Sequence, residues 1–123
     1  MEDRLLVYVV EDNARLIDAA QIIIRNRSRC GVVVSGSKVV GVISEGDILR
    51  ALLKGVDMHS SIDSWTIRGF RFLDSRDFGA AHQIMAEKGV TLVPVLDEEF
   101  HLVDVITTID LLKWLRPIGE PAV

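Results

Sequence analysis

The chain has 123 residues, of which 49% are hydrophobic and 26% are charged, and its formal net charge is −4. A chain of this length can form one domain whose core needs no disulfide or structural metal, and its single cysteine excludes an intramolecular disulfide. The negative charge argues against a nucleic-acid partner, and the lack of an apolar run of about 18 residues argues against a membrane span.

The first predicted elements are a strand and a helix. Residues 1–4 carry acidic side chains and no apolar segment, so we expect no secretory signal and a cytoplasmic location. Residues 5–10 are apolar and rich in valine, which predicts a strand. Apolar residues then recur at helical spacing at Leu16, Ala19, Ala20 and Ile23.

A hairpin and a second helix are predicted next. Residues 31–34 and 39–43 are valine-rich, and the four residues between them, Ser-Gly-Ser-Lys, predict a tight turn. A helix that begins at Glu45 and ends at Gly55 carries one apolar stripe. The members of this stripe are Ile48, Leu49, Leu52 and Leu53. Residues 1–55 therefore predict a unit with the order β-α-β-β-α.

The same order is predicted again after a connector. Residues 56–66 are polar and have no period, so they are expected to join the two units, and the second unit spans residues 67–116. Residues 117–123 are expected to form a flexible tail. The second unit's predicted elements are a strand around Phe70 and Phe72, a helix with Ala81, Ile84 and Met85, a hairpin of residues 92–96 and 100–106, and a helix with Leu111, Leu112 and Leu115.

The two halves also repeat in sequence. Residues 41–47 read Gly-Val-Ile-Ser-Glu-Gly-Asp, and residues 104–110, 63 positions later, read Asp-Val-Ile-Thr-Thr-Ile-Asp. Because only two copies are present, a pseudo-symmetric pair fits better than a solenoid, which needs about three repeats. We therefore expect an α+β (α/β) fold of two pseudo-symmetric β-α-β-β-α units, packed as a pair through their sheets or their helices.

A hydroxyl residue and an aspartate recur where a strand meets a helix in each unit. These pairs are Ser44 with Asp47 and Thr107 with Asp110. The spacing is typical of a capping box, which satisfies the free N–H groups of a helix start. The repeat also brings hydroxyls, carboxylates and helix N-termini near the interface of the units, which suits the phosphate and ribose of a nucleotide. Both interpretations remain open at this point.

Over nearly its whole length the chain resembles a tandem pair of cystathionine-β-synthase-type (CBS) domains, known as a Bateman module. Residues 41–47 fit the family pattern Gly-h-h-Ser/Thr-x-x-Asp, where h is apolar, and residues 93–97 fit its Pro-Val-h-Asp strand. The resemblance implies a cleft between the units that binds an adenosine-containing ligand such as AMP, ADP, ATP or S-adenosylmethionine.

The same resemblance assigns roles to particular residues. Asp47 and Asp110 would hold ribose hydroxyls, and Ser44 and Thr107 would contact ribose or phosphate. The segments 30–32 and 91–93 would flank the base or reach the phosphates, and the ligand-binding residues expected in and beside them are Arg29, Cys30, Gly31, Thr91 and Pro94. The chain departs from the family at Asp104, which replaces a glycine, and in the few basic residues next to its Pro-Val strand. These departures favour ligands with little negative charge, or no ligand.

The sequence thus predicts a regulatory module that is not an enzyme, needs no cofactor and forms a homodimer, with a fused or separate effector domain as its target. The alternative is a ligand-free dimerisation or protein-interaction scaffold, in which the capping boxes serve only the helices. His59, His82 and His101 lie too far apart in sequence for a typical metal site. We recognise no motif for nucleophilic catalysis.

Overall fold

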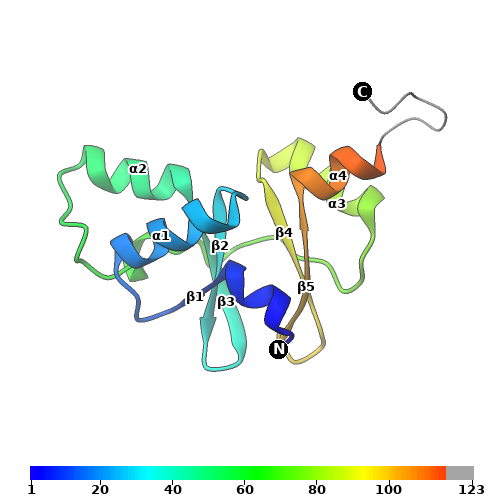
Figure 1. Ribbon diagram of the computed structural model, residues 1–123, viewed down its shortest axis with the longest axis horizontal. Coiled ribbons are helices and arrows are strands. Elements are labelled where there is room, and N and C mark those ends of the chain that lie inside the picture. Colours follow the sequence, from blue (N-terminus) through cyan, green and yellow to red (C-terminus); the bar gives the residue numbers. More distant parts are fainter. Residues whose placement is uncertain (116–123) are drawn as a thin grey trace.

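Two small β-sheets lie face to face at the centre of the molecule, and two helices cover the outer side of each sheet (Figure 1). The structure is a computed structural model, and residues 1–115 are described. The first sheet has the order β1-β2-β3, with β1 parallel to β2 and β2 antiparallel to β3. The second sheet is the antiparallel pair of β4 and β5. The strands are β1 (Val9–Glu11), β2 (Cys30–Ser35), β3 (Lys38–Ser44), β4 (Leu92–Leu96) and β5 (Leu102–Thr107).

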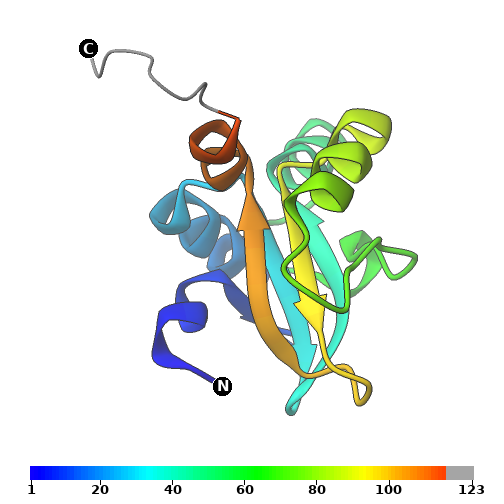
Figure 2. The same ribbon diagram turned by 90° about the vertical axis from the view of Figure 1, so that its right-hand side faces the viewer.

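The helices cover the sheets in the order that the repeat predicts (Figure 2). In each unit one helix precedes the hairpin and one helix follows it, which confirms the predicted pair of related α+β units. The α-helices are α1 (Leu16–Asn26), α2 (Glu45–Leu53), α3 (Phe78–Lys88) and α4 (Thr108–Trp114). Two 3₁₀-helices, η1 (Asp3–Tyr8) and η2 (Asp63–Trp65), lie in the N-terminal segment and in the connector.

The core has three parts, one between the sheets and one beneath each pair of helices. Successive side chains of a strand point to opposite faces, so Val32 and Val34 face the second sheet while Val33 faces the helices. Both faces of the first sheet are therefore buried, which explains why its sequence is a continuous valine run rather than an alternating one. Of the two predicted packing modes, the units meet through their sheets.

Two predicted strands are wrong. Residues 5–10 were expected to be extended, but η1 takes up most of this segment and only β1 remains as strand. The cause lies in tertiary packing, since Leu5 is buried in the core between the sheets and a helical turn places it there. The strand predicted around Phe70 and Phe72 is absent, although isolated bridges join Ile67 to Val42 and Leu73 to Val95. Here the aromatic rings pack on each other, with the Phe70 and Phe72 centroids 5.7 Å apart.

The predicted apolar stripe of α2 is only partly a core face. Ile48 is buried together with Ala51, whereas Leu49, Leu52 and Leu53 are exposed, Leu53 at 87%. Gly55 follows the helix with φ of +76°, as expected for a glycine after a helix end. The tail predicted for residues 117–123 lies outside the described residues.

Candidate ligand-binding site

The first capping box forms as predicted. Asp47 Oδ2 accepts hydrogen bonds from the backbone N–H and the hydroxyl of Ser44, both at 2.8 Å, and Ser44 Oγ accepts one from Asp47 N at 3.2 Å. The Asp47 side chain is nearly buried, and its second oxygen, Oδ1, is contacted by the guanidinium of Arg50 one turn along α2. The cap therefore needs only one of the two carboxylate oxygens of Asp47.

The second capping box has the same pattern. Asp110 Oδ2 accepts from Thr107 N at 2.9 Å and from Thr107 Oγ1 at 3.1 Å, and Thr107 Oγ1 accepts from Asp110 N at 3.3 Å. The helix-capping interpretation is thus confirmed for both pairs. Capping does not exclude a binding role, because a capped helix N-terminus still presents free N–H groups.

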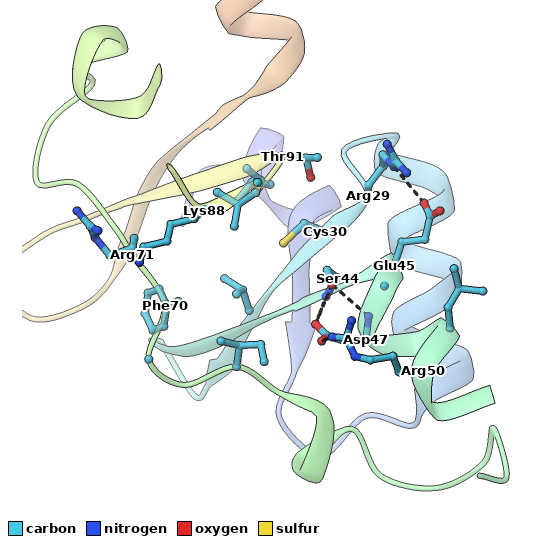
Figure 3. A pocket seen from close by; sticks show the side chains of 18 residues that line it. Arg29, Cys30, Ser44, Glu45, Asp47, Arg50, Phe70, Arg71, Lys88 and Thr91 are labelled. Carbon is cyan, nitrogen blue, oxygen red and sulfur yellow. Dashed lines mark hydrogen bonds and ion pairs between the residues drawn. The ribbon is translucent and has the colours of Figure 1, made fainter. Parts of the chain in front are cut away.

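A cavity of about 610 Å³ lies beside the first capping box, and we call it the first cleft (Figure 3). Three segments line it: the first unit, residues 67–71, which directly follow the predicted connector and which we call the connector region, and residues 88–92 of the second unit. Its lining residues are Arg29, Cys30, Val42, Ser44, Glu45, Gly46, Asp47, Leu49, Arg50, Ile67, Gly69, Phe70, Arg71, Lys88, Gly89, Val90, Thr91 and Leu92. A molecule bound there would contact both units at once.

The apolar wall of the first cleft depends on Gly41. A Cβ atom at this position would lie 2.5 Å from Thr66 Cγ2 and 2.8 Å from the Ile67 carbonyl oxygen. Because glycine has no Cβ, Ile67 can approach β3 and exchange two backbone hydrogen bonds with Val42, at 3.0 and 2.8 Å. This contact places Ile67, and Phe70 beyond it, in the wall of the cleft.

Four basic side chains line the first cleft, against two acidic ones. Arg50 pairs with Asp47, and Arg29 Nε lies 3.4 Å from Glu45 Oε2. Within residues 1–115, Arg71 and Lys88 form no ion pair. Figure 3 shows these two side chains on the opposite side of the cleft from Asp47 and Arg50. The first cleft therefore carries an excess of positive charge. The sequence did not predict this excess, because few basic residues lie next to the Pro-Val strand of residues 93–97.

Of these four cations the sequence predicted Arg29 and missed the other three, for different reasons. Arg50 follows Asp47 by three residues, a spacing that puts both on one helix face and could have been noticed. Arg71 comes from the connector region and Lys88 from the end of α3, so only the tertiary fold brings them to the cleft.

Cys30 lines the first cleft, but its thiol is unreactive. Burial, and to a lesser degree the negative charge of Asp47, raises the pKa of the Cys30 thiol to about 12. Its Sγ donates to the Gly31 carbonyl oxygen at 3.7 Å. A buried neutral thiol contributes an apolar surface rather than a nucleophile.

The predicted site residues divide into two groups. Those that line the first cleft are Arg29, Cys30, Ser44, Asp47 and Thr91. Gly31 does not, because a Cβ there would lie 2.7 Å from Val10 Cγ2 inside the sheet. Pro94 does not either, since its side chain is fully buried in β4. Thr107 and Asp110 lie at the start of α4, in the position that the repeat relates to the first cleft.

Two further features bear on function. Among residues 1–115, no group of three or more His, Cys, Asp or Glu side chains is placed to hold a metal ion. None of the described helices is long and apolar enough to span a membrane.

The sequence profile of the CBS domain matches residues 6–54 and 74–117. The chain therefore belongs to the CBS domain family, and the two matched segments are its two units. Comparison with curated protein sequences gave no match.

Solved structures with this fold include CBS domain pairs. The CBS domain protein PAE2072 from Pyrobaculum aerophilum, complexed with AMP, is 24% identical, with a TM-score of 0.74 over 83% of this chain and 80% of that one. A protein with CBS domains from Burkholderia ambifaria MC40-6 is 22% identical, with a TM-score of 0.82 over 94% and 87%. The CBS domain pair of protein MJ0100, in complex with 5′-methylthioadenosine and S-adenosyl-L-methionine, is 22% identical, with a TM-score of 0.75 over 88% and 90%.

Proposed function

We propose that this chain is a regulatory module, without catalytic activity, that binds an adenosine-containing ligand in the first cleft. The observation that carries the proposal is the cavity of about 610 Å³ beside the Ser44–Asp47 capping box, lined by both units and the connector region. This volume lies within the roughly 300–1,000 Å³ of typical small-molecule sites. The AMP bound to PAE2072 and the two adenosyl ligands bound to MJ0100 support the class of ligand.

The ribose would bind at Asp47. Its Oδ2 serves the helix cap, so the hydroxyls would bind at Oδ1, where Arg50 now lies. The Arg50 side chain is 60% exposed, so solvent screens its charge and a ligand can displace it at small cost. The base would pack against the apolar wall that includes Ile67 and Phe70. Stacking on an aromatic ring and a carboxylate for the ribose together distinguish a nucleoside from a simple sugar or anion.

The charge of the first cleft favours ligands that carry phosphate. Arg71 and Lys88 offer positive charge to such a ligand, and Arg50 gains a partner there when it leaves Asp47. AMP, ADP and ATP therefore fit this charge better than S-adenosylmethionine, whose sulfonium is positive. This preference replaces the expectation, drawn from the sequence, that weakly charged ligands would be favoured.

Regulation would follow from the way in which the first cleft joins the units. A ligand that contacts α2, Phe70 and Thr91 at once stabilises one relative arrangement of the units over others. The free energy available to an effector domain equals the difference in the ligand's affinity for the two arrangements. A homodimer would provide the partner surface, and exposed apolar side chains on α2 and α4, such as Leu53 and Leu112, support this part of the proposal.

Thermal unfolding with AMP, ADP, ATP, S-adenosylmethionine or adenosine, each at millimolar concentration, tests the proposal. A ligand at about 100 times its dissociation constant adds about 2.7 kcal/mol, or on the order of 10 °C in the unfolding midpoint. We expect the largest shift with one of the phosphorylated ligands. No shift with any of them contradicts the proposal.

The second candidate function is a ligand-free scaffold for dimerisation or protein interaction. The observation that favours it is that both capping boxes are complete without a ligand. The double substitution of Asp47 and Asp110 by Ala separates the two candidates. A scaffold would lose about 1 kcal/mol of stability at each cap and keep its partner, whereas a sensor would also lose its response to the ligand.

A further inference from the structure

The two units differ most at the first residue of the repeated motif. Gly41 and Asp104 are 63 positions apart, the same offset that relates Ser44 to Thr107. Ile67 lies against β3 beside Gly41. The residue 63 positions before Ile67 is Arg4, so Arg4 of the N-terminal segment is its counterpart in the other unit. We call the position related to the first cleft by the repeat the second cleft; its border includes Arg4, Val105, Thr107 and Asp110, the counterparts of Ile67, Val42, Ser44 and Asp47. Asp104 lies behind Arg4, as Gly41 lies behind Ile67.

Asp104 is held by two arginines from distant parts of the chain. Its Oδ1 accepts from Arg4 Nη1 at 3.0 Å, and its Oδ2 accepts from Arg76 Nη1 at 2.7 Å. Arg76 also donates to the Val105 carbonyl oxygen at 3.2 Å. We call these three residues, Arg4, Asp104 and Arg76, the arginine–aspartate cluster.

The cluster is partly shielded from solvent. The Asp104 side chain is 14% exposed, and burial opposes its ionisation. Hydrogen bonds from Arg4, Arg76 and its neighbour Val105 outweigh this effect and lower the pKa of the Asp104 carboxyl. Asp104 is thus a carboxylate anion, and each of its two oxygens accepts a hydrogen bond from a guanidinium group.

The N-terminal segment is anchored on both sides of the cluster. Next to Arg4, Leu5 is buried between the two sheets. Leu5 N also donates to the Glu2 carbonyl oxygen at 3.0 Å, which closes the first turn of η1. Among the described residues, η1 forms no backbone hydrogen bond with β5, whereas Ile67 forms two with β3. Arg4 meets β5 through its side chain instead.

We propose that the arginine–aspartate cluster fills the second cleft from within, so that the chain binds one adenosine ligand, in the first cleft only. Two arginines on one carboxylate form the kind of site that holds an anionic ligand, and here Asp104 takes the ligand's place. The inference rests on the proposed function of the first cleft and extends it to the number of ligands per chain. A substitution that removes the Asp104 side chain frees Arg4 and Arg76 and opens the second cleft.

Calorimetric titration with AMP and hydrogen–deuterium exchange test the inference together. The variants are Asp104→Gly, which copies Gly41, and Asp104→Asn, which keeps the size and removes the charge. Asp97→Asn is the control, because Asp97 is a carboxylate of the same unit that lies in the β4–β5 turn with His101. We expect one AMP per chain for the wild type and the control, and a second, weaker AMP for Asp104→Gly.

Exchange of the backbone amides of residues 3–8 reports on the cluster without any ligand. We expect Asp104→Asn to raise this exchange about threefold to tenfold, which is the effect of losing two partly exposed ion pairs. Two AMP molecules on the wild type, or faster exchange in Asp104→Gly without a second AMP, overturn the inference while the proposed function stands. If AMP binds to none of the proteins, the proposed function fails instead, and unchanged exchange then overturns the cluster's role as well.

Discussion

The first and second clefts of this CBS pair have the same capping box but different surroundings. At the first cleft Gly41 lets Ile67 approach β3, and a cavity of about 610 Å³ lies beside Asp47. At the second, Asp104 stands in place of the glycine and holds Arg4 and Arg76. The repeated motif therefore has the same structural role in both copies, and under the proposed function the residue at its first position decides whether that copy also binds a ligand.

The largest effect is expected from removing the feature that shapes the first cleft. Gly41→Ala places a Cβ atom too close to Thr66 and Ile67, so either these residues or β3 must move. The substitution should lower the free energy of unfolding by about 1–3 kcal/mol. Gly69→Ala is the matched control in the connector region, since its Cβ would meet no atom within 4 Å. For this control, urea unfolding should show a free energy of unfolding within about 0.5 kcal/mol of the wild-type value. Equal losses in both variants would contradict the role of Gly41.

The second prediction separates capping from binding. Asp47→Asn and Asp110→Asn should each destabilise the chain by about 0.5–2 kcal/mol, because both aspartates serve the same cap. Only Asp47→Asn should lower the affinity for AMP. The expected decrease is about tenfold to a hundredfold, which matches the loss of hydrogen bonds to a charged acceptor. Calorimetric titration measures the affinity. Equal weakening by both variants would mean that both clefts bind.

The third prediction concerns charge at the first cleft. Arg71→Gln and Lys88→Gln should each lower the affinity for ATP about threefold to tenfold at low salt, with a smaller effect at high salt, where screening weakens the attraction. Arg68→Gln is the control, because Arg68 pairs with exposed Asp63 and does not line the cleft. Adenosine, which has no phosphate, should bind the variants and the wild type alike.

The smallest effect is expected from pH at the second cleft. The pKa of Asp104 is lowered in the folded chain, so its contribution to stability is full above the pKa of the unfolded chain, about 4. That contribution is lost as the pH falls through the lower folded value. The stability difference between the wild type and Asp104→Asn, about 1 kcal/mol or less, should therefore shrink on acidification below about pH 4. A constant difference down to pH 2 would contradict an ionised Asp104.

Much of the fold follows from local patterns in the sequence. The hairpins, the four α-helices and both capping boxes are confirmed, because apolar periodicity and cap residues act over a few positions. The segments around Leu5 and Phe70 were predicted as strands and are not, since burial between the sheets and ring packing decide their conformation. These contacts link residues far apart in the chain, and no local pattern reports them.

The two capping boxes at the candidate site were predictable, and the difference between their surroundings was not. The motif pointed to Ser44 and Asp47, and the substitution at Asp104 was visible as a departure from the family. The partners of Asp104 are 100 and 28 positions away, so only the fold identifies them as Arg4 and Arg76.

The most direct test of the account is a crystal structure of the chain grown with AMP. We expect AMP in the first cleft, with its ribose hydroxyls at Asp47 Oδ1, Arg50 turned away from Asp47, and the arginine–aspartate cluster unchanged. AMP in the second cleft with Arg4 displaced from Asp104 would contradict the account.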